Sequence, residues 1–482
     1  MRSHPLDADV LIAGAGVAGL SCGAALADAG LRVLVFERER WAGGRAASRR
    51  DEVTGEMVDL GPHVLTNEHR HLLALLERLG TADQVLWQPD PFITLLDQGR
   101  QLQILSKPWL PPLQGLPNVP NTLSCVSPAD LMSNWRVAWQ AARLSEAGTL
   151  ALDDEDALGY LRRMGVSPRF IEWFWTPAVL SLLNVPLSRC SAAAMMRVFR
   201  LMVGRSGYHF GFPRIGLAEL FVPGCRQRIE RAGGRVCLSM PVRELRVGQG
   251  SFRGFVLGDG SRVDGSCGVL ALAPQALAPL CLRGEAAAAL RALGENALRF
   301  EPCPYVSTYL WFDRKVTLAR FWARVWAPGD LNTDFYDLSN IRGGRAAAPS
   351  LVASNAIHAH VARHWSDEQI VAQTRREVAQ FAPIAGRAAL RHARVHRIPM
   401  AIHCPVPGSE RLRPANPTAV PGLWLAGDWT ATAMPCSMES AARSGALAAE
   451  AVAARLGRRL RVAKPPPDTV GAVALLRERM AR

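Results

Sequence analysis

The stretch Gly14-Ala15-Gly16-Val17-Ala18-Gly19 decides how the first part of this chain folds. An apolar run at 10–13 precedes it, and a small-residue segment at 20–29 follows it. A second apolar run at 32–36 then ends on Glu37. This order predicts a strand, a helix and a parallel strand, with an acid about 20 positions after the glycines. Such a βαβ unit is typical of dinucleotide binding.

Each glycine of this loop has its own structural role. Gly14 permits the tight turn, Gly16 lets a pyrophosphate approach the backbone, and Gly19 lets the helix pack closely on the strand. The amides at the helix start, including that of Ala18, are expected to face the phosphates. Glu37 would accept hydrogen bonds from ribose hydroxyls and repel a 2′-phosphate. The spacing alone leaves NAD and FAD open.

Composition narrows the class of protein. A chain of 482 residues is long enough for two or three packed lobes. No run of about 18 residues lacks charge or strong polarity, and the N-terminus lacks the apolar core of a signal peptide, so a cytoplasmic protein is expected. The ten cysteines are scattered without paired spacing, which indicates reduced thiols and predicts no metal site.

The net charge of +14 is carried almost entirely by arginine. The arginines are dispersed, which argues against nucleic-acid binding. Attraction to an anionic membrane surface is one explanation, and a GC-rich coding sequence is the other. The apolar, proline-broken segment 108–117 is either a buried loop or a monotopic attachment to the inner face of the cell membrane.

Nucleotide-binding patterns recur in three segments, which alternate with two insertions. The expected dinucleotide-binding domain comprises residues 1–106, 207–289 and 396–460. The expected substrate domain, facing the membrane, comprises residues 107–206 and 290–395. Residues 461–482 form a C-terminal tail behind a run of prolines.

Two further motifs extend the first one. Glu37-Arg38 continues to Gly43-Gly44-Arg45, and an apolar strand delivers Gly427-Asp428 before a helix that starts near Met438. With these motifs, nearly the whole chain resembles the FAD-dependent amine oxidase and phytoene desaturase superfamily. The resemblance implies FAD as cofactor. It also implies an α/β fold, α+β over the whole chain, with a discontinuous Rossmann-like domain of the glutathione-reductase type and an inserted substrate domain of sheet plus helices.

The resemblance also implies which residues contact FAD. They are Gly14, Gly16, Ala18, Gly19, Glu37, Arg38, Gly43, Gly44, Arg45, Gly61, Pro62, His63, Val242, Gly427, Asp428 and Met438. In the family, residues at the place of Gly44 and Arg45 bind the diphosphate, and the residue matching Asp428 holds the ribitol. The backbone at Val242 would meet adenine, and the helix N-terminus near Met438 would face the flavin pyrimidine.

Two groups within the superfamily match different parts of the chain. Segments 174–177 and 212–221 resemble hydroxysqualene dehydroxylases, the squalene-associated desaturases, and segment 406–414 resembles plant-type phytoene and ζ-carotene desaturases. Pro399-Met400-Ala401 departs from the Pro-Arg-Ser step of the plant type. The first interpretation is therefore reduction of hydroxysqualene to squalene, with carotenoid desaturation as the alternative.

Two other interpretations stay open. Flavin amine oxidation is disfavoured, because no aromatic residue occurs between Ala431 and Pro435 to build an aromatic cage. A lipid-binding protein that keeps flavin only as a structural element is the other. The oligomeric state is left undetermined by the sequence.

Candidate catalytic residues are few. His63 and Glu439 are the two candidates for proton transfer, although a spacer against the cofactor and a helix-start acid are the plainer interpretations. The expected walls of an apolar substrate tunnel are Trp173, Phe174, Tyr309 and Trp311, with a place in the hydrophobic core as the alternative.

Overall fold

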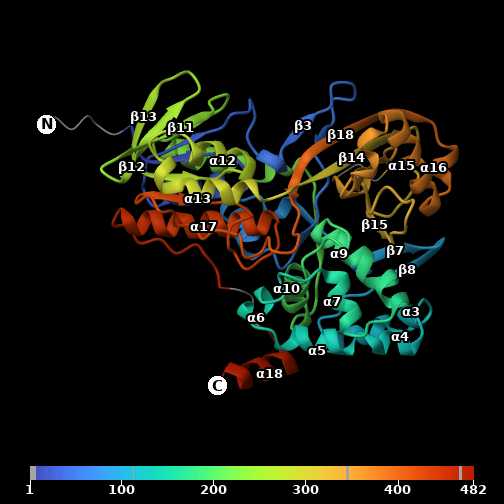
Figure 1. The fold of residues 1–482 in the computed structure, drawn as a ribbon. Coiled ribbons are helices and arrows are strands. Elements are labelled where there is room, and N and C mark those ends of the chain that lie inside the picture. The colour runs from blue at the N-terminus through green and yellow to red at the C-terminus, as the bar shows by residue number, and fades with distance from the viewer. Residues whose placement is uncertain (1–6, 89, 112, 344–346, 466–468, 482) are drawn as a thin grey trace.

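The computed structural model describes residues 7–88, 90–111, 113–343, 347–465 and 469–481. Two seven-stranded sheets lie next to each other, and a group of helices lies below the second sheet in the view of Figure 1. The chain passes between these parts repeatedly, so each is assembled from distant segments.

The first sheet is built around the expected βαβ unit. Its order is β10-β2-β1-β13-β12-β11, with β19 paired to β13. β1 and β2 are parallel, with Val10 opposite Val33, and β13 and β19 are parallel to them. Strands buried on both faces need continuous apolar runs, which is the pattern seen at β1. The bounds are β1 (Ala8–Ala13), β2 (Val33–Phe36), β10 (Arg235–Cys237), β11 (Val242–Gly248), β12 (Ser251–Leu257), β13 (Arg262–Leu270) and β19 (Leu423–Leu425).

Helices of small residues cover this sheet. α1 (Val17–Asp28) packs between the sheet and α17 (Met438–Arg455). This contact brings the N-terminal and C-terminal parts of the chain together. A Cβ at Gly445 of α17 would lie 2.4 Å from Ser21 Oγ, so glycine permits this approach. The other helices here are α2 (Arg70–Leu79), α11 (Val222–Arg231), α12 (Pro274–Leu282) and α13 (Ala287–Leu298).

The second sheet has the order β18-β14-β17-β16-β15-β7-β8. Its longest strands are the edge strand β18 and its neighbour β14, which pair antiparallel with Tyr309 opposite Arg394. The bounds are β7 (Ile93–Asp97), β8 (Arg100–Ile104), β14 (Pro302–Phe312), β15 (Phe321–Arg324), β16 (Asp334–Asp337), β17 (Leu351–Ala356) and β18 (Leu390–His403). α14 (Leu338–Ile341), α15 (Asp367–Phe381) and α16 (Ile384–Arg387) accompany it.

The second sheet corrects two expected domain boundaries. β7 and β8 fall within 1–106, yet they belong to this sheet, because β7 pairs in parallel with β15 at Leu95 and Ala323. The boundary at 395/396 cuts through β18. Both differences come from strand pairing over long sequence separations, which local patterns do not record. Elsewhere the domain division stays a prediction.

The helical lobe consists of residues 119–203. Its helices are α3 (Val119–Leu123), α4 (Pro128–Ser133), α5 (Trp135–Arg143), α6 (Glu146–Leu150), α7 (Ala157–Arg163), α8 (Pro168–Phe170), α9 (Thr176–Leu183) and α10 (Ala192–Val203). A π-helical turn, Ile171–Trp175, lies between α8 and α9. The last helix, α18 (Gly471–Ala481), packs on α5. The small sheets are β3 (Ser48–Arg50) with β4 (Met57–Asp59), and β5 (Leu65–Thr66) with β9 (Phe210–Pro213) and β6 (Val85–Trp87).

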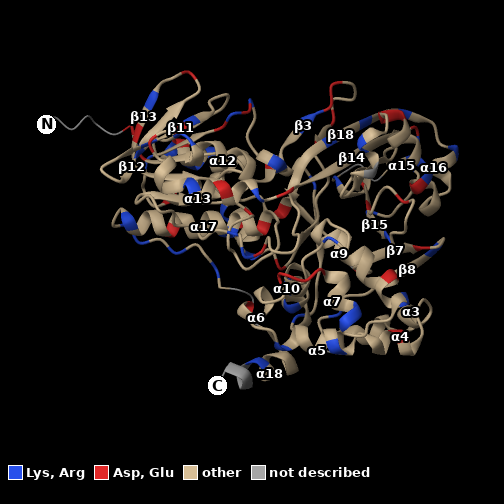
Figure 2. Ribbon diagram, in the orientation of Figure 1, with Lys and Arg blue, Asp and Glu red and all other residues tan. Residues whose placement is uncertain are grey.

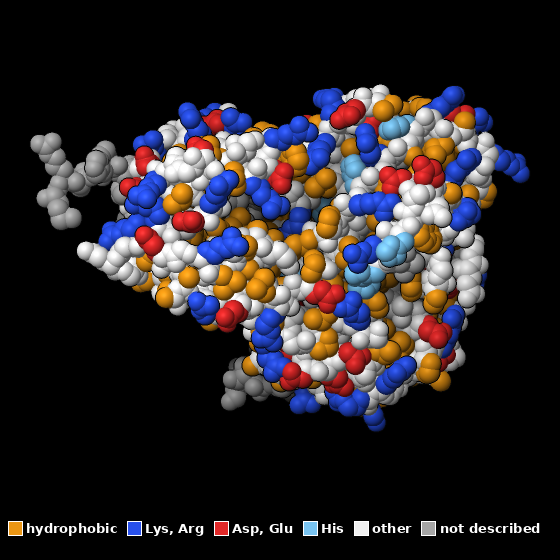
Figure 3. Space-filling model, turned by 45° about the horizontal axis from the view of Figure 1, so that its top comes forward, with side chains coloured by type: hydrophobic (Ala, Val, Ile, Leu, Met, Phe, Trp, Pro, Cys, Tyr) orange, Lys and Arg blue, Asp and Glu red, His pale blue; other side chains and the backbone are white. Residues whose placement is uncertain are grey.

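Charge is distributed over all parts of the molecule. Figure 2 shows Lys and Arg interspersed with Asp and Glu on both sheets and on the helical lobe. The face in Figure 3 is hollowed where the first sheet and its helices meet the second sheet. Within the described residues, no helix combines the length and apolar character that a membrane crossing requires.

Candidate functional site

The glycine loop leaves an open space at the start of α1. A Cβ on Gly14, whose φ is +103°, would lie 2.4 Å from the carbonyl oxygen of Ala271. One on Gly19 would lie 2.0 Å from the carbonyl oxygen of Gly14. A Cβ on Gly16, in contrast, would meet no atom nearer than 4.0 Å. The first two glycines are required by the fold itself, whereas Gly16 borders free space.

The N-terminus of α1 points its amides into that space. The first turn closes when the amide of Leu20 donates to the carbonyl of Gly16 at 2.9 Å. Amides before this bond, such as that of Ala18, have no carbonyl one turn earlier in the helix. The loop carrying Gly43 closes on the other side, because its amide donates to Ala15 O at 2.8 Å. A helix N-terminus between two glycine loops is suited to a diphosphate.

Glu37 lies at the end of β2, beside the glycine loop. Its two carboxylate oxygens accept the amides of Ala15 at 2.9 Å and Glu39 at 3.0 Å. Each oxygen keeps a lone pair for a further donor, such as a ribose hydroxyl. The Glu37 carbonyl accepts the amide of Met240, which brings the start of β11 at Val242 close to the same place.

Asp428 follows β19, on the other side of β1 from β2. Its buried carboxylate pairs with the guanidinium of Arg45 at 2.6 Å, and Arg45 also donates to the carbonyl of Ala401 at 2.9 Å. Burial disfavours the carboxylate, but Arg45 outweighs burial and lowers the pKa of Asp428 below its ordinary value. Three segments therefore meet at one ion pair.

Arg413 holds the loop that presents Asp428, and no sequence pattern singled it out. Its buried guanidinium donates to the carbonyls of Thr430 at 3.0 Å, Met434 at 2.6 Å and Asp428 at 2.9 Å. Its charge is paired with Glu410 at 3.0 Å. Five donors in a rigid fork suit an arginine to fixing such a loop. A pattern search misses this residue because its partners are backbone carbonyls.

The Gly61-Pro62-His63 turn lies against the second sheet. A Cβ on Gly61 would be 2.8 Å from Ser307 Oγ, and the Pro62 carbonyl accepts the Asn355 amide at 3.1 Å. His63 Nδ1 donates to the Gly61 carbonyl at 2.7 Å. Burial lowers the pKa of His63, so its ring is neutral near pH 7 and leaves Nε2 as an acceptor.

A buried carboxyl stands behind this turn. Asp334 accepts hydrogen bonds from Asn355 Nδ2 at 3.1 Å and from Thr333 Oγ1 at 2.5 Å. Burial raises the pKa of Asp334 despite these donors. Sequence reasoning missed Asp334 and Asn355, because both are ordinary strand residues until β16 and β17 place them beside His63.

A small cavity lies where the helical lobe meets the end of β18. Its apolar lining comes from Leu182, Leu183, Ala194, Ile402, Pro405 and Pro435. Its polar side includes Cys436, whose Sγ lies 3.2 Å from His403 Nδ1. Burial lowers the pKa of His403 to about 4, so the imidazole is neutral near pH 7.

The four expected substrate-binding residues lie elsewhere. Trp173 and Phe174 pack within the core of the helical lobe. The Tyr309 hydroxyl donates to the Asp59 carbonyl at 2.8 Å, and Trp311 Nε1 donates to Glu56 at 3.2 Å. Tyr309 and Trp311 therefore join the second sheet to the segment around β4. All four residues have packing or domain-joining contacts in the structure, and their contact with substrate stays a prediction.

Glu439 has a different role from the catalytic one expected. Its buried carboxylate accepts the amides of His71 at 3.0 Å and Leu72 at 2.9 Å, and His71 Nδ1 donates to it at 2.7 Å. These amides belong to the first turn of α2, so Glu439 caps that helix from α17. Both carboxylate oxygens of Glu439 accept hydrogen bonds from α2, and we correct Glu439 to a structural residue.

The arrangement fits a dinucleotide. The free space at Gly16, at the α1 N-terminus, matches a diphosphate. Glu37 on one side of β1 and Asp428 on the other match the sugar hydroxyls of a ribose and a ribityl chain. The remaining predicted contacts, including Arg38, Gly44, Gly427 and Met438, lie in the same loops and stay predictions.

Comparison with solved structures agrees with this fold. The chain is similar to cyclohexylamine oxidase from Brevibacterium oxydans, with a TM-score of 0.66, 20% identity, and coverage of 94% of this chain and 100% of that one. It is also similar to a putative protoporphyrinogen oxidase from Exiguobacterium, with a TM-score of 0.65, 16% identity, and coverage of 92% and 98%.

Comparison with curated sequences adds relatives along the full length. A 15-cis-phytoene desaturase of Synechococcus elongatus is 26% identical over 92% of this chain and 96% of its own. A hydroxysqualene dehydroxylase of Sinorhizobium fredii is 25% identical over 92% of this chain and 97% of its own. The desaturase match is the stronger one, which reverses the order expected from the short motifs.

The family model for flavin-containing amine oxidoreductases matches residues 17–453. This range begins within the glycine loop, at Val17, and contains the Arg45–Asp428 pair and the second sheet. The expected FAD cofactor is confirmed by this match, and so is the expectation of an oxidoreductase. The chain therefore belongs to the flavin-containing amine oxidoreductase family and is an FAD-dependent oxidoreductase.

Proposed function

We propose that this chain dehydrogenates a long polyisoprenoid hydrocarbon, of the class to which phytoene belongs. The observation that carries the proposal is the end-to-end similarity to the Synechococcus desaturase, which covers both sheets and the helical lobe. This is the alternative that the sequence motifs ranked second.

The residues of the chain divide the work of such a reaction. FAD, when bound, supplies the hydride acceptor. Glu37, Asp428 and the α1 N-terminus would hold it, and Arg413 fixes the loop of Asp428. We assign to His63 Nε2 the proton that leaves the carbon next to the site of hydride loss. His63 suits this role because its Nδ1–H is engaged with Gly61 and its ring is neutral.

The absorption spectrum of the flavin, followed after rapid mixing, reports both the reduction and the reoxidation of the cofactor. Oxidised holoenzyme is mixed without oxygen with phytoene in liposomes, and loss of the oxidised flavin band is expected together with a desaturated product by chromatography. Squalene, a hydrocarbon of similar character without the conjugated triene, serves as the control. No flavin reduction by phytoene or by any related polyene would overturn the proposal.

Reductive dehydroxylation of hydroxysqualene is the second candidate. The full-length match to the Sinorhizobium enzyme favours it. Asp334, a buried carboxyl near His63 whose pKa is raised by burial, is the candidate proton donor. A departing hydroxyl needs such a donor. The same apparatus separates the two candidates, because reduced holoenzyme would be reoxidised by hydroxysqualene only if this second reaction occurs.

We also propose that the protein binds an anionic bilayer through the far end of the helical lobe. Large apolar side chains are exposed there, on the segment expected for attachment and beyond it. They are Trp109, Leu110, Leu113, Leu116, Leu123, Met132, Trp135 and Trp139. Arg136 and Arg143 lie over the rings of Trp135 and Trp139 at 5.6 Å and 5.5 Å.

The placement of these residues supports a membrane-facing surface. Figure 1 shows α3, α4 and α5 at the lower end of the molecule, with α18 beside them, and Leu475 of α18 is also exposed. Aromatic and arginine side chains together are suited to the headgroup region of a bilayer. A hydrocarbon substrate would reach the enzyme from such a surface.

A further inference from the structure

A cluster of soft ligand atoms lies outside the flavin site. Cys303 begins β14, Cys404 follows β18 directly, and His358 lies in the turn after β17. One ligand atom from each lies within 4.8 Å of both others, and it is the one such group of metal-ligating side chains among the described residues. We propose that these three residues bind a zinc ion.

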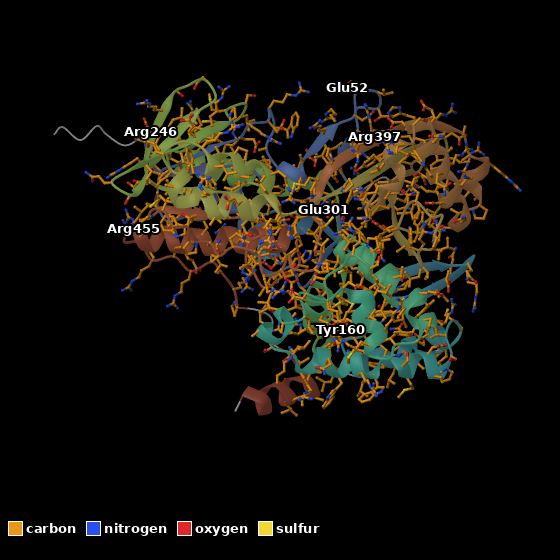
Figure 4. All side chains as sticks on the ribbon, in the orientation of Figure 1. Glu52, Tyr160, Arg246, Glu301, Arg397 and Arg455 are labelled. Atoms are coloured by element: carbon orange, nitrogen blue, oxygen red, sulfur yellow. The ribbon has the colours of Figure 1, made fainter. Side chains whose placement is uncertain are left out.

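The backbone holds the two cysteines in place. Pro302 pairs with His403 and the amide of Cys404 donates to the Glu301 carbonyl at 2.7 Å, so the two thiols are diagonal neighbours on antiparallel strands. Both side chains are completely buried, and Figure 4 shows the labelled Glu301 at the centre of the molecule. Strand pairing, not a flexible loop, sets the distance between the sulfurs.

His358 completes the cluster from the solvent side. Its Nδ1 lies 3.8 Å from Cys303 Sγ, and its backbone has φ 53°, a conformation that a non-glycine residue adopts at a cost. Tetrahedral zinc with ordinary bond lengths separates sulfur from nitrogen by about 3.6 Å and sulfur from sulfur by about 3.8 Å. The observed spacing is thus close to that of a zinc site before any movement.

The ligand types of the cluster agree with zinc binding, because two thiols and one imidazole lie together. A thiolate is the form that binds metal. Two thiolates and an imidazole form a borderline-soft set that suits Zn²⁺ better than Mg²⁺ or Ca²⁺.

The site would join three segments at a central position. It ties the start of β14, the end of β18 and the turn after β17, and Cys303 Sγ also donates to the Asn184 carbonyl behind α9 at 3.1 Å. His360 lies next to His358, with its exposed ring 4.4 Å from that of His358. A closed, structural role follows, since the ligands belong to strand ends and not to an open pocket.

Zinc titration of the reduced holoenzyme tests the proposal. Competition with a chromophoric chelator, under exclusion of oxygen, is expected to show one zinc bound per chain. Cys303→Ser, Cys404→Ser and His358→Gln should each weaken binding at least tenfold. Cys125→Ser and His364→Gln are the matched controls, because Cys125 is half-buried in the helical lobe and His364 is exposed in the same turn region as His358.

Two further measurements keep the test decisive. Zinc should protect two thiols from a thiol reagent in the wild type and none in His358→Gln. His358→Cys, which restores a ligand at a half-buried turn position, should retain zinc where His358→Gln loses it, even if the buried cysteine variants fail to fold. Absence of zinc uptake by the wild type, equal loss in the controls, or a Cys303–Cys404 disulfide in place of metal would refute the site.

Discussion

At the scale of single residues, the glycine loop contains two kinds of glycine. Gly14 and Gly19 are required because a Cβ on either would clash with a backbone carbonyl oxygen. Gly16 has no such neighbour, so the fold alone does not require it. Its requirement comes from the diphosphate that has to approach the backbone.

Gly16→Ala is therefore expected to fold and to lose FAD. The added methyl meets no protein atom within 4.0 Å, so the free energy of unfolding of the apoprotein should change by less than about 0.5 kcal/mol. The affinity for FAD, measured by fluorescence quenching, should fall at least tenfold.

Gly14→Ala is the matched comparison. Its φ of +103° and the carbonyl of Ala271 at 2.4 Å should destabilise the apoprotein itself. If Gly16→Ala and Gly14→Ala lose the same stability in the absence of FAD, the two glycines do not differ as inferred.

At the scale of elements, the N-terminus of α2 and the loop after β19 are held by charged residues from distant segments. α2 lacks a local side-chain cap, and Glu439 of α17 takes its place. The loop after β19 is likewise held by Arg413, which precedes that strand. Both contacts use a charged group against backbone dipoles, which makes them stronger than neutral hydrogen bonds.

Glu439→Gln should weaken the protein and leave its chemistry intact. Loss of the charge at the α2 N-terminus is expected to cost about 1–3 kcal/mol of unfolding free energy, measured by urea denaturation. Glu295→Gln, on the exposed side of α13, is the control and should cost little. An unchanged stability with a lower turnover per bound flavin would show instead that Glu439 takes part in catalysis.

Glu410 links the helical lobe to the flavin-binding loop and should make stability pH-dependent. It pairs with Arg413 and with Arg197 of α10, and although burial opposes it, these arginines lower its pKa from 4.5 to about 2. A lowered pKa contributes stability that is present above about 4.5 and is lost as the pH falls toward 2.

The difference in unfolding free energy between wild type and Glu410→Gln isolates this effect. At pH 7 the variant should be less stable by about 3–5 kcal/mol, because the buried Arg413 loses its carboxylate partner and Arg197 keeps only Glu146. The gap should narrow as the pH is lowered from 4.5 toward 2. A gap that stays constant over this range would mean that Glu410 does not titrate with a lowered pKa.

At the scale of the whole molecule, a group of exposed apolar side chains lies at the end away from the nucleotide fold. Figure 1 shows the helical lobe projecting away from the first sheet, with α5 and α18 at its tip. A protein that takes its substrate from a bilayer needs such a separation, because the surface at the membrane and the cofactor site then do not compete.

Trp135→Ser/Trp139→Ser should reduce binding to anionic liposomes several-fold in a flotation assay. Both indoles are about half exposed, at 56% and 47%, so their replacement removes contacts with lipid without disturbing the core. Leu298→Ser/Leu318→Ser removes two exposed leucines away from this end and should bind as the wild type does. Equal loss in both double variants would contradict a membrane surface on α5.

The local part of the fold could be predicted because its determinants lie close together in the sequence. The βαβ unit spans about thirty residues, and its strand–helix–strand order follows from apolar and small-residue patterns within that span. Local patterns place β7 and β8 in the first domain. The pairing of β7 with β15 spans more than two hundred residues, so no local pattern reveals it. A similar limit applies to Tyr309, whose alternation indicates a strand but not the neighbour it faces.

The residues of the candidate site likewise fall into two groups, those that the sequence reveals and those that it does not. The motifs around Gly16, Arg45 and Asp428 are visible in the sequence because each is a short pattern that follows an apolar strand. Arg413, Asp334 and the cysteine cluster are not, since an arginine or a cysteine acquires its role only from partners that tertiary packing supplies.

The sequence by itself thus determined the dinucleotide loop, its acid at Glu37 and the return strand to Asp428, because sterics restrict those positions to few residue types. Only the tertiary structure decided the hydrogen-bond partners of Glu439 and Tyr309 and the neighbours of Cys404. Buried polar groups must find partners, and the pairing of distant strands and helices determines which partners they find.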